Sequence, residues 1–280
     1  REIFSTLMKY GVFVMLTAAA GMFLGRIDVL MLAYFKGMSD VAFYEVALPI
    51  ATIILIAITP LTAFLFPTIS HYYHNRQFKM IRSILQAIYN TGFFLFLPLG
   101  IIFFLFPQEI IIVLFGPKYV SARIALQILS IGFIFKGFSL LNFAVALGIG
   151  KVKTKSLIIF IGAILNVILN FVLIPPFGIT GAAIATSLSF LVMFIASLSY
   201  IESKIRFGPP YKNWVKTILN SILFVFIIYS LKTLLELNIY LETAIVIGIS
   251  GLIYLLIGFK WNILDYRNLK NTFFKTVGLE

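Results

Sequence analysis

Eight apolar stretches divide this chain, and each is long enough to cross a lipid bilayer as a helix. Apolar residues make up 61% of the sequence and charged residues only 11%, whereas soluble domains carry about 25% charged residues. The expected fold class is therefore an all-α membrane protein, a bundle of about eight transmembrane helices. The expected spans are residues 5–35, 41–66, 81–106, 121–147, 156–174, 179–200, 214–235 and 240–259.

Prolines lie inside two of these stretches. Pro49, Pro60 and Pro98 are expected to kink or break the second and third spans. In transporters, broken helices expose backbone groups to a cavity, although a simple packing kink is the alternative. Residues 107–119 are too short to span and are expected to lie at the membrane surface as a short helix.

The loops between the spans are unequally charged. With the N-terminus on the cytoplasmic side, sixteen of the 22 Lys and Arg residues fall in cytoplasmic segments and four in outer segments. This is a positive-inside pattern, so we expect a multi-pass protein of the cell membrane with both termini in the cytoplasm. The net charge of +12 then reports topology and contact with anionic lipid, and no nucleic acid is expected as a partner.

Lys136 is the most informative polar residue. It lies near the middle of the span 121–147, about 20 Å from either end of the surrounding apolar run, which is beyond the reach of a snorkelling side chain. A cation at this depth faces a partner or a water-filled cavity. A lysine that is neutralised in place, or paired with a carboxylate of another helix, is the alternative. Because few acids lie within the spans, we expect Lys136 to face a cavity that handles something polar or anionic.

Arg26 and Asp28 lie in the first span but point in different directions, since two helical residues differ by about 200°. Asp28 shares its face with Gly21 and has Gly25 beside that face, and such small residues are typical of a close helix contact or a cavity wall. Both charges lie near the expected outer interface. A snorkelling Arg26 and a locally paired Asp28 therefore compete with a role in binding.

Three asparagines complete the set of candidate substrate-binding residues. Asn142 is about 120° around the helix from Lys136 and is expected to line an adjoining wall. Asn166 and Asn170, one helical turn apart, form a polar stripe in an apolar span. Interhelical asparagine hydrogen bonds contribute roughly 0.6–2 kcal/mol, so a structural clamp is as good an interpretation of this stripe as a ligand contact.

Signatures of enzymes are missing from the sequence. It contains no cysteine, no glycine-rich phosphate loop, no HExxH or GxSxG motif and no paired acids. We therefore expect no enzyme, no catalytic residue, no metal site and no cofactor.

Several segments together resemble a known family. Residues 166–190 read NVILNFVLIPPFGITGAAIATSLSF. Four more segments resemble the corresponding segments of the same family and occur in the same order. They are GRIDVLMLAYFKGMSDVAFYEVA, FLFPTISHYYHNRQF, VLFGPKYVSARIALQILS and GIGKVKTKS. The chain resembles the oligosaccharide and polysaccharide flippases (Wzx-like) of the multidrug/oligosaccharidyl-lipid/polysaccharide exporter superfamily, and the resemblance covers nearly its whole length.

The resemblance implies a MATE-like fold of two six-helix lobes with a central cationic cavity. That cavity binds the pyrophosphate of a polyprenyl-linked glycan and moves the head group across the membrane. Residues 1–202 would form the six-helix C-terminal lobe, 203–260 an additional helix pair and 261–280 a cytoplasmic tail. Lys136, Arg26 and Asp28 are the positions expected at the cavity. The N-terminal lobe is missing from the sequence, so we expect a fragment of a longer protein, or else a chain that requires a partner subunit or a second copy.

The leading hypothesis is a flippase for polyprenyl-pyrophosphate-linked oligosaccharide in surface polysaccharide biosynthesis. A cation-coupled exporter of drugs or small molecules from the same superfamily is the related alternative, although its cavity would more often carry carboxylates. A membrane-embedded polyprenyl-phosphate glycosyltransferase and a non-transporting assembly subunit are alternatives of other classes.

Overall fold

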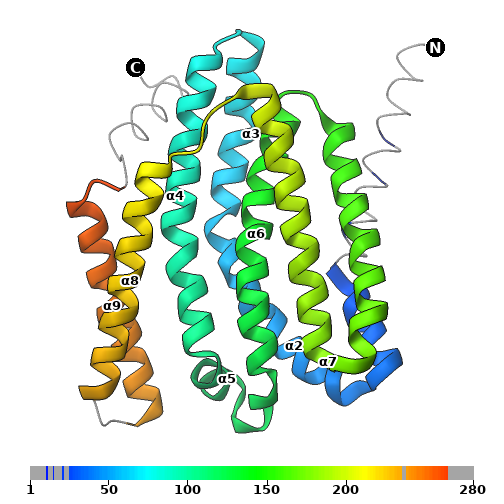
Figure 1. The fold of residues 1–280 in the computed structure, drawn as a ribbon, viewed down its shortest axis with the longest axis vertical. Coiled ribbons are helices and arrows are strands. Elements are labelled where there is room, and N and C mark those ends of the chain that lie inside the picture. Colours follow the sequence, from blue (N-terminus) through cyan, green and yellow to red (C-terminus); the bar gives the residue numbers. More distant parts are fainter. Residues whose placement is uncertain (1–10, 12–14, 16–20, 22–24, 235–237, 264–280) are drawn as a thin grey trace.

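The described part of the chain is an array of helices that lie side by side (Figure 1). The computed structural model describes residues 11, 15, 21, 25–234 and 238–263. After a helical segment at residues 25–36, the elements are α2 (Met38–Thr52), η1 (Ile53–Ala57), α3 (Thr59–His74), α4 (Phe78–Leu105), α5 (Pro107–Phe115), η2 (Pro117–Ala122), α6 (Arg123–Gly148), α7 (Val152–Ile205), α8 (Tyr211–Leu234) and α9 (Ile239–Lys260).

Six helices of the described residues are long and apolar enough to cross a membrane, which confirms an all-α membrane protein. The count differs from the expected eight for two reasons. Much of the first span, 5–35, lies outside the described residues, and the predicted spans 156–174 and 179–200 are counted together in α7.

The stretch 41–66 was predicted as one span that its prolines kink or break, and the structure contains a break within it. It forms α2, a tight 3₁₀ segment at η1 and the start of α3, which continues to His74. Pro60 has no amide hydrogen and its ring clashes with the preceding turn, which disfavours a regular helix through this point. The chain instead closes an i−3 hydrogen bond from the Ile58 amide to the Leu55 carbonyl, 3.0 Å long.

α7 consists of two antiparallel arms joined at Gly178. The φ and ψ angles of this glycine are 54° and −130°, a conformation that side-chain-bearing residues rarely adopt, and Pro175 and Pro176 precede it. The arms touch closely beside the bend, since a Cβ on Gly181 would lie 2.1 Å from the Leu173 carbonyl oxygen. The two spans predicted here are thus confirmed as two arms with a sharp reversal between them.

α6 lies centrally, in contact with α2, α3, α4 and the second arm of α7 (Figure 1). α8 and α9 pair with each other and lie at one edge, beside α4. The Tyr254 hydroxyl donates to the Phe94 carbonyl at 2.9 Å, and the Asn220 amide donates to the Tyr254 carbonyl at 3.1 Å. The first bond and the apolar packing around Phe94 attach the C-terminal pair to α4, and the second bond joins α8 to α9.

The α3–α4, α6–α7 and α7–α8 connections lie at the same end of the array, whereas α5 and the bend of α7 lie at the opposite end (Figure 1). We call the first of these the basic end, because its connections and the adjoining helix turns carry most of the basic residues. They include Arg76, Lys79, Arg82, Lys151, Lys153, Lys204, Arg206 and Lys212.

Candidate functional site

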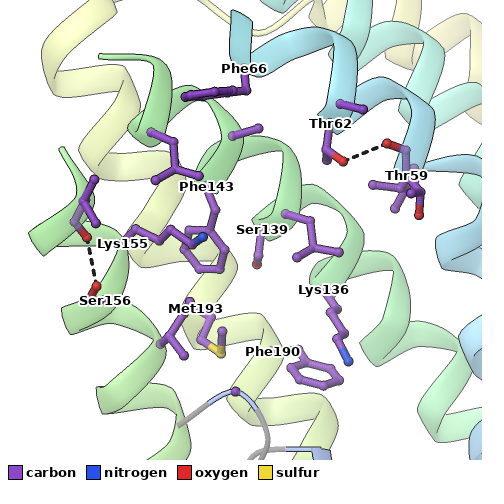
Figure 2. Close-up of a pocket in the computed structure, with 18 of the residues that line it drawn as sticks. Thr59, Thr62, Phe66, Lys136, Ser139, Phe143, Lys155, Ser156, Phe190 and Met193 are labelled. Carbon is purple, nitrogen blue, oxygen red and sulfur yellow. Dashed lines mark hydrogen bonds between the residues drawn. The ribbon is translucent and has the colours of Figure 1, made fainter. Parts of the chain in front are cut away.

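A pocket of about 780 Å³ lies beside α6. Its walls come from the first helical segment, the break between α2 and α3, α6, and both arms of α7 (Figure 2). Thr59, Ala63 and Phe66 are exposed lining residues, so the pocket opens at the surface of this chain on the α3 side. The break at Ile58 comes so close to α6 that a Cβ on Gly137 would lie 2.1 Å from the Ile58 Cδ1 atom.

Lys136 lines this pocket from the middle of α6, 13 residues after Arg123 and 12 before Gly148. The side chain is half-buried, and its ammonium lies 4.8 Å from the ring centre of Phe133 and 4.7 Å from that of Phe190. Two aromatic faces stabilise the cation without neutralising it. No carboxylate among the described residues lies within 4.0 Å of the Lys136 ammonium. The Asp28 carboxylate attracts the ammonium from a greater distance without forming an ion pair. The cation is therefore positioned at the pocket without a directly paired acid.

The helical face predicted for Lys136 is the face that lines the pocket. Ser139 and Phe143 follow it along the same wall, and Gly21 and Gly25 contribute from the first helical segment. The Ser139 hydroxyl donates to the Phe135 carbonyl within its own helix, at 2.9 Å. The hydroxyls of Thr59 and Thr62 likewise donate to backbone carbonyls. Because these hydroxyl hydrogens are engaged locally, the Lys136 ammonium is the strong donor that this wall offers to a ligand.

A second cation in the pocket, Lys155, was not singled out from the sequence. It lies in the first turn of α7, is half-buried, and extends into the pocket toward Phe143 (Figure 2). Its nearness to a loop made it one of many basic residues on the expected cytoplasmic side. Its place in the opening turn of an apolar helix, antiparallel to the helix of Lys136, was the signal that could have found it.

Asp28 is not among the pocket-lining residues and is buried in a separate polar cluster, with 1% of its surface exposed. Its carboxylate accepts a hydrogen bond of 2.6 Å from the Tyr44 hydroxyl and one of 3.3 Å from the Thr186 hydroxyl. It also accepts a 2.9 Å bond from the Val29 amide. The carboxylate is therefore satisfied inside the bundle, by α2 and the second arm of α7.

Asn166 and Asn170 belong to the same cluster. The Asn166 amide contacts Thr186 Oγ1 at 3.2 Å, and the Asn170 amide donates to the Asn166 side-chain oxygen at 3.0 Å. Both side chains are fully buried, and the Asn170 oxygen has no hydrogen-bond partner among the described residues. The predicted polar stripe therefore joins the two arms of α7 to the Asp28 carboxylate, and we call these connected residues the Asp28 cluster.

Asn142 faces away from the pocket and not along an adjoining wall of it. It is fully buried, it accepts a hydrogen bond from the Tyr89 hydroxyl, and its amide donates to Ser197 Oγ at 3.0 Å. This asparagine connects α6 to α4 and to the second arm of α7. All its described contacts are helix-to-helix contacts.

Arg26 lies on the surface. Its guanidinium forms an ion pair of 2.8 Å with Glu45, and 70% of its side chain is exposed. Of the six candidate residues, the structure thus brings Lys136 to the pocket, brings Asp28, Asn166 and Asn170 together in one buried cluster, and leaves Asn142 and Arg26 apart from both. No group of three His, Cys, Asp or Glu side chains suited to a metal ion occurs in the described ranges.

The long apolar helices define a multi-pass α-helical membrane protein, and its pocket is lined by two lysines. Residues 14–172, more than half of the chain, match the MatE family, and the chain belongs to that family. This confirms the resemblance to the multidrug/oligosaccharidyl-lipid/polysaccharide exporter superfamily.

The relatives agree with this assignment. An uncharacterized membrane protein of Methanocaldococcus jannaschii, MJ1068, is 32% identical over 99% of this chain and 55% of its own length. The Haloferax volcanii protein named "Probable low-salt glycan biosynthesis flippase Agl15" is 25% identical over 97% of this chain and 57% of its own length. The chain thus spans about half the length of the curated relatives it matches.

A solved structure shares the fold. Lipid II flippase MurJ, in an inward closed conformation, superposes with a TM-score of 0.70 at 20% sequence identity, over 88% of this chain and 52% of MurJ. The described helices therefore share the fold of about half of MurJ.

Proposed function

We propose that this chain is the C-terminal lobe of a flippase that moves polyprenyl-pyrophosphate-linked oligosaccharide across the cell membrane for surface polysaccharide biosynthesis. In this proposal residues 1–202 form the lobe, 203–260 the additional helix pair and 261–280 a tail. The basic end faces the cytoplasm, in keeping with the positive-inside pattern. An N-terminal lobe, from the rest of a longer chain or from a partner subunit, closes the cavity.

The observation that carries the proposal is the position of Lys136. A cation held at about 20 Å from either end of its helix is costly in lipid and is retained where it serves a ligand or a pathway. Lys136 projects into a pocket, contacts two aromatic faces and has no directly paired acid among the described residues. A pyrophosphate supplies the missing negative charge, and charge-assisted hydrogen bonds of this type are among the strongest in proteins.

The alternatives have less support. A cation-coupled drug exporter would need negative charge where its substrate binds, and none of the described pocket-lining residues is Asp or Glu. A polyprenyl-phosphate glycosyltransferase would need acids positioned for catalysis, and the buried carboxylate of Asp28 is engaged by Tyr44 and Thr186. The relatives whose names state a role are named as flippases.

The test is complementation by the full-length protein, in a strain that lacks it. Lys136→Ala is expected to abolish export of surface glycan while the protein level in the membrane stays the same. Lys136→Arg keeps the charge and is expected to retain part of the export. Lys118→Ala, which removes an exposed lysine of η2, is the matched control and is expected to behave like the wild type.

Two results would contradict the proposal. Normal glycan export in the Lys136→Ala strain would remove Lys136 from the mechanism. Loss of drug resistance in that strain, with glycan export intact, would favour the drug exporter.

A further inference from the structure

The pocket contains a second positive charge that its architecture does not neutralise. Lys155 lines the pocket from the opening turn of α7 and is half-buried, although a lysine so close to a helix end has a short path to solvent. No described hydrogen bond or ion pair holds its ammonium. Two cations in one partly desolvated pocket repel each other and favour an anionic occupant.

The two lysines occupy different depths. α6 and the first arm of α7 run antiparallel on either side of the turn at residues 149–151. Lys136 lies 12 residues before Gly148, whereas Lys155 lies 3 residues after Val152. At 1.5 Å per residue, their backbones are about 13 Å apart along the helix axes, with Lys155 nearer the basic end.

The side chains keep these two positions distinct. Lys136 points to Phe190, whereas Lys155 points to Phe143 (Figure 2). Phe143 is two turns beyond Lys136 on the same face of α6, in the direction of the basic end. The pocket therefore contains an inner cation between two aromatic rings and an outer cation near the connection between α6 and α7.

We propose that Lys155 is a capture residue, which contacts the phosphate-bearing head group as it enters from the basic end and before it reaches Lys136. This inference rests on the proposed function, because that function supplies the phosphate. A charge near the mouth of a site acts mainly on the association rate, whereas a desolvated charge at the bottom acts mainly on the dissociation rate. The two lysines therefore have separable effects.

The experiment measures both rates for a defined probe. Full-length protein in nanodiscs is immobilised, and geranylgeranyl diphosphate is passed over it, with empty nanodiscs as the reference. Lys155→Gln is expected to lower the association rate constant about fivefold with little change in dissociation. Lys136→Gln is expected to raise the dissociation rate constant instead. Inorganic pyrophosphate, tested in parallel, shows whether the lipid tail contributes to binding.

Lys153→Gln is the matched control, since it removes the same charge from an exposed side chain two residues away that does not line the pocket. An equal fall in association rate for Lys153→Gln and Lys155→Gln would overturn the capture role, because a general surface potential would then account for it. An unchanged association rate for Lys155→Gln would do the same. Either failure leaves the proposed function standing on Lys136, whereas loss of the Lys136 effect alone counts against the proposed function.

Chemical restoration of the charge gives an independent readout. The 280 residues contain no cysteine, so Lys155→Cys offers one defined thiol in a cysteine-free full-length background. Treatment with 2-aminoethyl methanethiosulfonate returns an ammonium group and is expected to restore the association rate. Treatment with the 2-sulfonatoethyl reagent adds a negative charge and is expected to lower the rate further. Equal rates after the two treatments would contradict a role for charge at this position.

Discussion

Two groups of intramembrane polar residues differ in what they contact. In the Asp28 cluster, a carboxylate, two hydroxyls and two amides bind one another across the first helical segment, α2 and both arms of α7. In the pocket, Lys136 and Lys155 have no described hydrogen-bond acceptor from the protein. The side chains of the Asp28 cluster hydrogen-bond to one another, whereas the two lysines of the pocket remain available to a ligand.

The difference shows how polarity serves two purposes in one bundle. In an apolar environment a polar cluster whose members hydrogen-bond to one another holds helices in a defined arrangement, because other arrangements leave more buried groups unpaired. An unneutralised cation contributes no such bond and carries a desolvation cost. Substitutions in the cluster should therefore reduce stability, and substitutions of the lysines should reduce transport at nearly constant stability.

The largest loss of stability is expected for Asp28→Ala. It leaves the Tyr44 and Thr186 hydroxyls without their shared acceptor in a buried site, and an unmet buried group costs about 1–3 kcal/mol. We expect the free energy of unfolding to fall by about 2–3 kcal/mol, measured by thermal or denaturant unfolding in detergent. Asp28→Asn keeps one acceptor oxygen and should lose less. An unchanged unfolding midpoint for Asp28→Ala would show that the cluster is not structural.

A smaller loss is expected for Asn142→Leu. It removes the contacts that connect α6 to Tyr89 and Ser197, and interhelical hydrogen bonds in membranes contribute about 0.6–2 kcal/mol. We expect a loss of about 1–2 kcal/mol in the same unfolding assay, with transport reduced only in proportion to the folded protein. Ser139→Ala, which removes a hydroxyl bonded within its own helix, is the control and should cost less. Loss of transport by stably folded Asn142→Leu would place this asparagine in the transport pathway.

The smallest effect is expected for Arg26→Gln. The ion pair with Glu45 is largely exposed, and such pairs contribute at most about 1 kcal/mol. We expect a change below about 0.5 kcal/mol and normal glycan export. Abolished export in Arg26→Gln would show that this arginine acts in the assembled cavity, as the family resemblance suggested.

Features that depend on one helix were predictable, and those that depend on neighbouring helices were not. Apolar length gave α4, α6, α8 and α9 to within a few residues, and depth within α6 pointed to Lys136. Proline chemistry indicated a break in the second span, but not the 3₁₀ segment at residues 53–57 that brings Ile58 against α6.

The roles of single polar residues were harder to predict. Asn142 was assigned to an adjoining wall from its angle relative to Lys136, but that face packs against α4 and the second arm of α7. Lys155 was missed because its direction depends on how α7 folds back beside α6. In both cases the helical face was calculable, whereas the identity of the neighbour was a property of the assembled bundle.

The central claim, that the pocket lysine serves a ligand and not the fold, is tested most directly by the stability of Lys136→Met. Methionine occupies a similar volume and can stack its thioether on Phe133 and Phe190, while the desolvated charge is removed. The unfolding midpoint in detergent is predicted to equal or exceed that of the wild type, in a variant that no longer exports glycan. A fall in midpoint as large as that of Asp28→Ala would show that Lys136 holds the bundle together and would contradict the account.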